Sequence, residues 1–486
     1  MVRHQVRTGS AVHADAQQIV ILDGSVERVD GLPAQHGAGA FDGHTGHHRN
    51  GYSKVAPQLF HRHQPRLEAA GIETGLDEQK VGASLDEAFG LQVVIGAKPG
   101  EGGGAGDIEI LVGGSHGTGD EARLQQGEDV NALYKAHWQA LEARRWREEV
   151  TTGRIKRARI DLLLSYWLSI HTGSEVPVER LFADFRIWLQ HTTLTAAEIL
   201  ADLAHHGRAM QRMENLQPTI ATGRLLQVLD LLTTTTPIPL MLHLHARDGV
   251  SEEQRSLAAA AIESYLIRRM ACGLTTKDYN RLFLSILQTI RVAEDDTVGE
   301  QLVRQLADQS APSRYWPEDG EFLTGLTQAN IYRLLRGPRL RVLLGGMETA
   351  LRKDKSELLF VPAQVVKLNI EHLIPQKWSQ YYPLPTDRPI EEAEARRDLA
   401  LHRLGNLTLT TTKLNSSISN GSWPTKRKEL NKHAVLLVTA GSVLQAPPGV
   451  PSDMAIAWLD TWDEDRIELR TLYLAKIAIH AWPGPA

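Results

Sequence analysis

Apolar positions divide the chain into two stretches of different texture, which meet near residue 129. Beyond that point apolar residues recur every three or four positions, the spacing of an amphipathic helix. The pattern predicts helices over residues 155–171, 257–270, 328–335 and 341–351, and a loop over 233–239. Residues 129–352 are therefore expected to form an all-helical domain.

Within the second stretch the pattern changes again at residue 357. Short runs of β-branched residues and leucines predict strands over 358–361, 365–370 and 404–411. Residues 413–420 favour a short helix or turn, 424–436 a longer helix, and 454–481 a Trp-rich pair of helices. Residues 353–486 thus predict a small α+β domain, and the fold class expected for the chain is mainly α.

The first 128 residues lack this regularity. Residues 1–127 contain 23 of the 40 glycines and 9 of the 20 histidines but none of the ten tryptophans. Such a composition buries too little apolar surface to offset the entropy cost of ordering. We expect a disordered or aberrant Gly/His-rich region rather than a native folded domain, although the run 92–95 fits a strand. Its groups of histidines are better explained as scattered residues of a biased composition than as the ligands of a metal ion.

Composition excludes some classes of protein. No apolar run reaches the length of a membrane span, and the N-terminus lacks the apolar core of a signal peptide. The single cysteine, Cys272, excludes an internal disulfide, so a cytoplasmic protein is expected. The net charge is −5, but residues 403–433 carry six basic residues against one acid. We expect this local excess to contact a phosphate backbone.

The candidate chemistry lies in three neighbouring motifs. Ile370-Glu371-His372-Leu373-Ile374-Pro375-Gln376 is followed by Leu404-Gly405-Asn406-Leu407-Thr408-Leu409 and by Asn415. A histidine can act as general base, and a carboxylate with a later amide can supply oxygen ligands to a hard cation. Together the motifs favour hydrolysis of a phosphodiester. Alone, Glu371-His372 would be read as a polar pair at a strand end, just as His243, His245 and Cys272 are expected to be structural.

These motifs resemble the C-terminal nuclease domain of the GmrSD type IV restriction endonucleases, in the HNH branch of the His-Me finger nucleases. Ser419-Asn420, Lys426 and the closing pattern Trp462, Ile467, Arg470 and Trp482 also fit. Residues 262–269 and 316–322 resemble the helical part that follows the ParB-like nucleotidase domain in the same proteins. The resemblance covers residues 129–482 and implies a ββα-metal fold for residues 353–486.

The resemblance also implies roles for individual residues. His372 matches the general base, and Glu371 and Asn415 match the ligands of one Mg²⁺ or Mn²⁺ ion. Asn406 matches the Asn that ties the loop and helps to orient the base. The positions that match residues near the phosphate or DNA are Asn420, Lys426 and Lys428.

Family members begin with a nucleotidase domain that bears an Asp-Gly-Gln-Gln-Arg motif, which this sequence lacks. We therefore expect a truncated or mis-called member, although NTP is the family's expected cofactor. The function expected is a DNA endonuclease of restriction and antiviral defence, acting as a homo-oligomer or with a separate nucleotidase subunit and without a membrane partner. The alternatives are an inactive, nuclease-derived scaffold that binds DNA or protein, and a nuclease directed at RNA.

Overall fold

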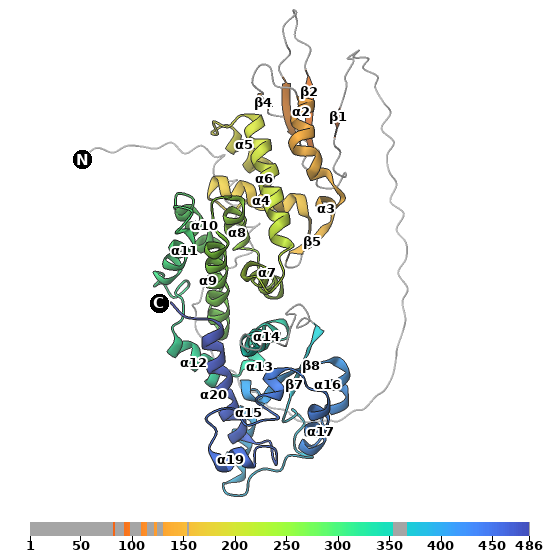
Figure 1. Cartoon of the computed structure of the whole chain (residues 1–486), viewed down its shortest axis with the longest axis vertical. Coiled ribbons are helices and arrows are strands. Elements are labelled where there is room, and N and C mark those ends of the chain that lie inside the picture. The colour runs from red at the N-terminus through yellow and green to blue at the C-terminus, as the bar shows by residue number, and fades with distance from the viewer. Residues whose placement is uncertain are drawn as a thin grey trace, which may run out of the picture. The chain divides into compact units, whose positions relative to one another are not determined.

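The computed structural model describes residues 81–82, 92–97, 108–113, 121–123, 130–152, 155–352 and 367–485. The chain divides into the units 1–75 and 76–486, and every described residue belongs to the second unit. The described part is mostly helical, as predicted (Figure 1). None of the described helices is long and apolar enough to cross a membrane.

Short strands precede the helices and form small sheets. Strands β1 to β4 pair in sequence order as an antiparallel sheet, and β5 and β6 form a second antiparallel pair. Their bounds are β1 Val81–Gly82, β2 Gln92–Ala97, β3 Ile108–Gly113, β4 Glu121–Arg123, β5 Glu149–Thr152 and β6 Ile155–Ala158. The prediction of a strand at 92–95 is confirmed by β2. The other predictions for residues 1–128 fall mainly outside the described residues.

Helices account for most of the described residues up to 352. Between β4 and β5 lie α2 Val130–Leu133, a π-helical turn Tyr134–Trp138, a 3-10 turn Gln139–Glu142 and α3 Arg144–Arg147. After β6 come α4 Arg159–Thr172, the 3-10 turn Val178–Arg180, α5 Leu181–Leu189, α6 Ala196–Glu214, α7 Ala221–Leu232, α8 Ile238–Ala246, α9 Glu252–Ala271, α10 Tyr279–Ile290, α11 Val298–Ala307, α12 Asp319–Gln328, α13 Ile331–Leu334 and α14 Pro338–Arg352.

The C-terminal part combines one strand pair with further helices. Its elements are β7 Asn369–His372, α15 Ile390–Leu401, the 3-10 turn η5 Leu404–Asn406, β8 Leu407–Thr410, α16 Thr412–Ile418, α17 Trp423–His433, α18 Leu437–Ala440, α19 Ser452–Ile456 and α20 Glu464–Ala481. The order of β7, β8 and α16 agrees with the predicted sequence of two strands and a helix. The predicted strand at 358–361 lies outside the described residues.

Several predicted elements are wrong at their ends. The helix expected over 328–335 is α13, Ile331–Leu334, and the strand expected over 365–370 is β7, Asn369–His372. Two further cases show the reason. The helix expected over 155–171 begins only at Arg159, because residues 155–158 pair with β5 as strand β6. The strand expected over 404–411 begins only at Leu407, because Leu404–Asn406 forms a 3-10 turn. In both places contacts with other parts of the chain decide the local structure: β5 pairs with residues 155–158, and α20 binds η5. The spacing of apolar residues along the sequence does not show these contacts.

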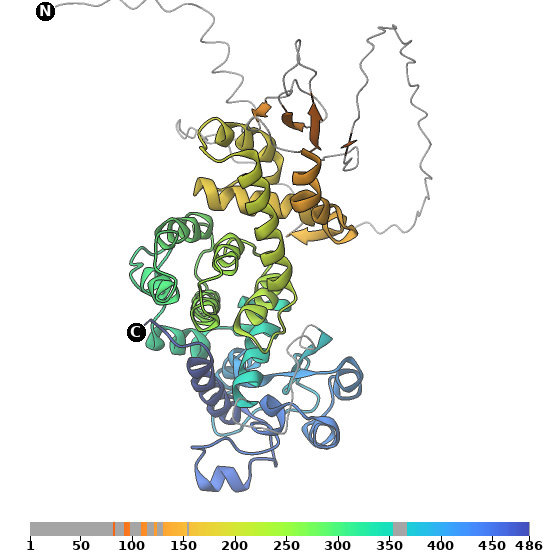
Figure 2. The same ribbon diagram turned by 45° about the horizontal axis from the view of Figure 1, so that its top comes forward.

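Three apolar cores fill the described part. The first extends from the turns before α3 through α11 to Trp316 and includes Trp167, Tyr265 and Phe283. The second is shared by α12, α13, α14, η5, β8 and α20, so it contains residues from both sides of residue 352. The third packs the loop after β7 against α16, α17 and the start of α20. Because α20 contacts α14 and α12, it joins the last helices to the preceding ones (Figure 1, Figure 2).

Buried polar contacts reinforce this junction. The wholly buried Arg268 of α9 donates to the carbonyl oxygens of Trp482, at 2.7 Å, and Pro317, at 3.0 Å. Its guanidinium also pairs with Asp319 at 2.5 Å. The indole of Trp482 donates to Glu263 at 2.9 Å. The two fragments singled out in the sequence, 262–269 and 316–322, therefore meet around one buried arginine and the C-terminal tryptophan.

Gly405 marks the closest approach of η5 to α20, and it supplies a test of this packing. A Cβ at residue 405 would overlap the carbonyl oxygen of Ile467 and lie 2.8 Å from the amide nitrogen of Thr471. We predict that Gly405→Ala lowers the free energy of unfolding by about 1–3 kcal/mol, the usual cost of overpacking. Urea denaturation measures the change.

The matched control is Gly320→Ala on the exposed side of α12, where an added Cβ meets nothing within 4 Å. Alanine there is expected to leave stability unchanged or raise it by up to about 1 kcal/mol, since alanine favours helix more than glycine does. Equal midpoints for the Gly405→Ala variant and the unmodified protein would contradict the predicted close approach.

Candidate active site

Strands β7 and β8 form the frame of the site. They pair antiparallel, with Glu371 opposite Thr408 and His372 opposite Leu407. Residues directly opposite each other point to the same face of a strand pair, and neighbours along a strand alternate. Glu371 and His372 therefore leave β7 on opposite faces, and β7 ends at His372.

On the first face, Glu371 meets Lys426 from α17. The ammonium of Lys426 donates to Oε1 of Glu371 and, at 2.6 Å, to the carbonyl oxygen of His372. Lys426 is completely buried and Glu371 almost so. Burial raises the pKa of Glu371 and lowers that of Lys426, and each charge opposes the shift of the other. Lys426 thus holds the carboxylate in place, instead of projecting into solvent.

Asn415 lies on the same face as Glu371. It belongs to α16, whose N-cap is Thr411, and its Oδ1 accepts a hydrogen bond of 3.1 Å from the hydroxyl of Thr410. Thr410 and Thr408 are two positions apart on β8 and share a face, so the amide of Asn415 is held against the face of the strand pair that carries Glu371. A second bond, from Asn369 to Thr412 at 3.1 Å, fixes α16 against β7.

The oxygen donors on this face fit a hard cation that keeps much of its water. None of the described residues donates to Oε2 of Glu371, and the amide oxygen of Asn415 has a second lone pair beside the one used by Thr410. Among the described residues no three His, Cys, Asp or Glu side chains form a metal-binding group. One carboxylate and one amide suit Mg²⁺, which prefers oxygen ligands and retains several waters.

On the second face, His372 packs into an aromatic group. Its ring centroid lies 4.4 Å from that of Tyr332, in an edge-on arrangement, and 5.7 Å from that of His402. Tyr332 in turn stacks on His402 at 5.6 Å. Nε2 of His372 is buried and has no hydrogen-bond partner among the described residues. Burial, reinforced by His402 and Lys426, lowers the pKa of His372 to about 3, so its imidazole is neutral at physiological pH.

Asn406 holds the chain directly after His372. Its side chain accepts from the amide of Ile374 at 2.8 Å and donates to the carbonyl oxygens of Ile374 and Leu401, both at 2.9 Å. Its own carbonyl oxygen accepts from the amide of Leu373 at 2.9 Å. All these groups are used within the protein, so Asn406 positions the turn after β7 and has no contact with solvent.

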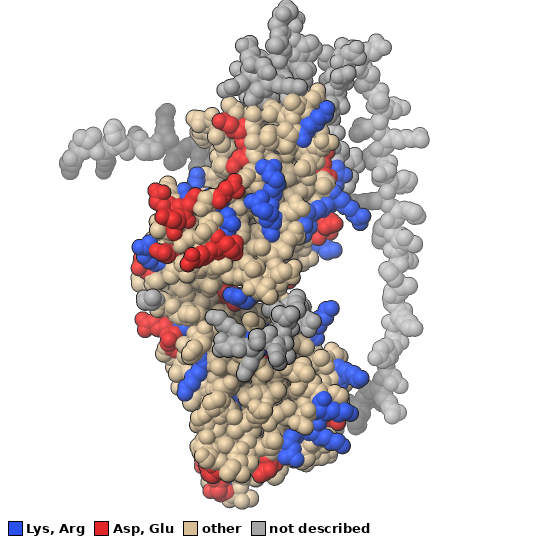
Figure 3. Space-filling view, in the orientation of Figure 1, with Lys and Arg blue, Asp and Glu red and all other residues tan. Residues whose placement is uncertain are grey.

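The basic segment 403–433 contributes both internal and surface charges. Lys426 is internal, and Arg403 donates to the carbonyl oxygen of Thr327. The fully exposed cations are Lys413, Lys428 and Lys432. On the face drawn in Figure 3, basic side chains gather at the lower right, over α16 and α17. Asn420, just beyond α16, is also exposed.

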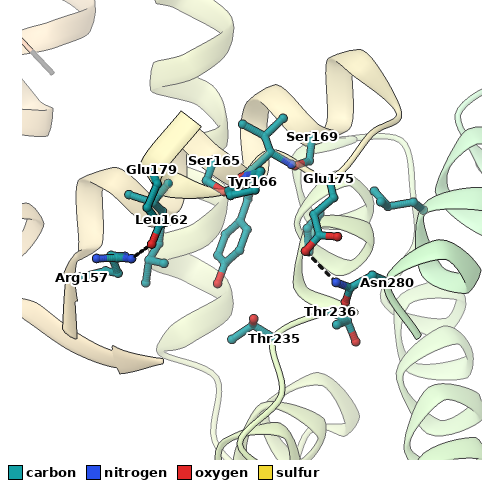
Figure 4. Close-up of a pocket in the computed structure, with 15 residues that line it drawn as sticks. Arg157, Leu162, Ser165, Tyr166, Ser169, Glu175, Glu179, Thr235, Thr236 and Asn280 are labelled. Atoms are coloured by element: carbon teal, nitrogen blue, oxygen red, sulfur yellow. Dashed lines mark hydrogen bonds and ion pairs between the residues drawn. The ribbon is translucent and has the colours of Figure 1, made fainter. Parts of the chain in front are cut away.

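A separate cavity of about 250 Å³ lies beside α4. Figure 4 shows the ring of Tyr166 projecting from α4 toward Thr235. Two pairs of polar side chains lie in its wall: Arg157 with Glu179, and Asn280 with Glu175 at 2.6 Å.

His245 and Cys272 lie outside these sites, and their contacts agree with the structural roles expected for them. His245 is buried and lies 3.2 Å from the hydroxyl of Thr222. Burial raises the pKa of Cys272 to about 12, which keeps its thiol protonated and a poor nucleophile.

Comparison with known proteins identifies the part of the chain that contains this site. Residues 316–477 match the family model described as GmrSD restriction endonucleases, C-terminal domain. The matched residues include the β7–β8 pair and the helices α16 and α17. The match confirms the resemblance for the C-terminal part, and it supports a nuclease of the restriction type there. No curated protein matches the chain.

The GmrSD match also covers residues ahead of the nuclease domain that was expected from the sequence. It begins at Trp316 and so includes α12, α13 and Tyr332, ahead of the boundary expected at residue 353. Tyr332 and His402 pack around His372, and neither was a candidate. His402 does immediately precede the Arg403–Asn406 segment, which was the available signal. Tyr332 has no such signal, because only the folded chain brings it to β7.

The buried histidines predict a dependence of stability on pH. Burial lowers the folded pKa of His372 and His243 to about 3 and that of His245 to about 4, below the 6.5 of the unfolded chain. Between these values the unfolded state binds more protons, so stability is fully present above pH 6.5 and is lost as the pH falls. Each histidine contributes a slope of up to about 1.4 kcal/mol per pH unit.

Urea unfolding between about pH 7 and about pH 5 measures this slope. We expect His372→Gln, which cannot titrate there, to reduce it. His433→Gln, on the exposed end of α17, is the control and should leave it unchanged. A slope that is the same in all three proteins would contradict the neutral burial of His372.

Proposed function

We propose that this GmrSD C-terminal domain is an HNH-type, metal-dependent endonuclease that hydrolyses phosphodiester bonds in DNA. One observation carries the proposal. Within the matched segment, β7, β8, α16 and α17 bring Glu371, Lys426 and Asn415 to one face at a strand end, next to a surface that bears three exposed lysines. Oxygen donors beside a basic surface suit a cation and a phosphate backbone.

His372 acts as the general base in this proposal. Its imidazole is neutral, so it can accept a proton from the attacking water, and the ring is held by Tyr332 and His402. Because β7 ends at His372, the two faces of the strand meet at that edge, where one phosphate can contact both. Bound negative charge beside the imidazole would raise the His372 pKa and strengthen it as a base.

Glu371 and Asn415 would hold the ion, Mg²⁺ or Mn²⁺, by oxygen. When bound, such an ion stabilises the charge that develops on the phosphate and the leaving oxygen. Lys426 orients the Glu371 carboxylate, and Asn406 orients the turn after His372. Asn420 and Lys428 are exposed and are proposed to contact the DNA backbone. Restriction of invading DNA, NTP dependence and a separate nucleotidase subunit remain predictions.

The buried pair of Glu371 and Lys426 favours a second candidate, an inactive nuclease-derived scaffold. The ammonium already neutralises the carboxylate that would bind the cation, and His372 is only 7% exposed. A plasmid-nicking assay with and without Mg²⁺ separates the two candidates: nicking that requires the ion favours the enzyme, and its absence favours the scaffold. The same assay on RNA tests whether the substrate is DNA.

We predict that His372→Ala abolishes cleavage of duplex DNA, because the variant lacks the group that accepts the proton from water. Loss of a general base lowers the rate by about 10²–10⁴-fold. DNA binding should stay near that of the unmodified protein, since the imidazole is not a surface cation. Cleavage rates and a filter-binding assay measure the two properties. His433→Ala, an exposed histidine in the same domain, should cut normally. Undiminished cutting by His372→Ala would exclude this base.

We predict that Asn415→Ala raises the Mg²⁺ concentration needed for half-maximal cleavage, because one of two protein oxygen ligands is lost. A titration of the initial rate with Mg²⁺ gives this concentration. The matched control is Asn431→Ala, an exposed asparagine on α17, which should titrate like the unmodified protein. An unshifted titration for Asn415→Ala would argue against metal ligation by that residue.

A further inference from the structure

We infer that α13, the turn after it and the start of α14 form a second phosphate-binding surface, which holds the DNA backbone on the His372 side of the nuclease site. The surface, here the arginine ridge, consists of Arg333, Arg336 and Arg339. This inference rests on the proposed function and adds a partner surface from the helices that precede β7. Its ligand is the sugar-phosphate backbone of duplex DNA.

Charge is the first observation. Residues 331–341 contain four arginines and no acid. The three ridge arginines are exposed, and in the described part of the chain none of them forms an ion pair. Elsewhere arginines do pair with carboxylates, as Arg224 does with Glu263. Clustered cations that lack such partners repel one another, and a polyanion removes this repulsion.

Local structure makes the ridge a fixed surface. Ile331, Leu335 and Leu340 are completely buried in the second core. Along the chain Ile331 precedes the ridge arginines, Leu335 lies among them and Leu340 follows them. Gly337 has φ +48°, a left-handed conformation that glycine adopts without strain, and Pro338 opens α14 at once. The tight turn therefore places Arg336 and Arg339 on either side of a rigid corner. The backbone that carries the three arginines is therefore already fixed before DNA binds.

Proximity to the proposed base is the second observation. The amide of Tyr332 donates to the carbonyl oxygen of His402 at 3.2 Å, which ties α13 to the chain before η5. The Tyr332 ring lies against His372, so Arg333 follows directly after a residue in contact with the base. Arg333 is also close enough to His402 to lower its pKa, second only to burial, while Asp398 opposes this shift.

The arginine ridge and the exposed lysines of α16 and α17 are next to opposite faces of the β7–β8 pair. The lysines belong to the helices that deliver Asn415 and Lys426 to the Glu371 face. The ridge begins in α13, whose Tyr332 contacts His372. A backbone that crosses the end of β7 can therefore contact cations on both sides. Contacts of this kind position a duplex and do not read its sequence.

The test measures binding of a labelled duplex without divalent cations, so that no cleavage interferes. We expect the triple variant Arg333→Gln, Arg336→Gln, Arg339→Gln to bind more weakly. The slope of log affinity against log salt should shrink by about 2.7, since each phosphate contact contributes about 0.9. The triple Arg→Lys variant at these positions keeps the charge and should retain most of the slope. Arg281→Gln with Arg304→Gln, exposed on α10 and α11, is the control and should not change it.

Each outcome bears on the inference. An unchanged slope for the triple Gln variant, or equal losses in the Gln and Lys variants at unchanged urea midpoints, would overturn it. So would an unmodified protein that does not bind DNA. Failure of the proposed function is visible separately, because it would appear as an unmodified protein that binds DNA through the ridge but does not nick a plasmid when Mg²⁺ is added.

Discussion

The architecture around the site depends on one buried cation, the guanidinium of Arg470. It is completely buried and donates to the carbonyl oxygens of Gly405, at 2.6 Å, Leu407, at 2.9 Å, and Val438, at 2.7 Å, and to the hydroxyl of Ser442 at 2.9 Å. Burial lowers its pKa to about 9, so it remains charged at neutral pH. Because these dipoles replace its hydration, the cation fixes η5, the start of β8 and α18 around α20.

The catalytic proposal follows from this fixed point. Once η5 is held, Asn406 lies where its amide can bind both polar groups of Ile374, and the turn after His372 is fixed in its turn. The same turn aligns β7 with β8, which sets Glu371 opposite Thr408. A buried cation and a buried amide thus determine where His372, the proposed base, and the carboxylate of Glu371 lie.

Much of the fold and of the candidate site could be predicted from the sequence, because helix periodicity and short motifs are local signals. Helix periodicity predicted α9 and α14, and the Glu371-His372, Asn406 and Asn415 motifs predicted a strand pair followed by a helix. What could not be predicted depends on partners far apart in the chain. From the sequence alone Lys426 would be read as a surface cation. It is buried because its ammonium pairs with the carboxylate of Glu371, 55 residues earlier in the chain.

The same reasoning bears on where the nuclease unit begins. A base supported only by β7, β8 and α16 would be self-contained after residue 353, but the ring against His372 comes from Tyr332 in α13. The second core also joins α13 and α14 to β8 and α20, and Arg268 of α9 binds the carbonyl oxygen of Trp482. Separation at residue 352 would therefore expose apolar surface and remove one wall of the imidazole site. The helices before β7 are part of the environment that keeps His372 neutral, and they belong to the site as much as the motif itself does.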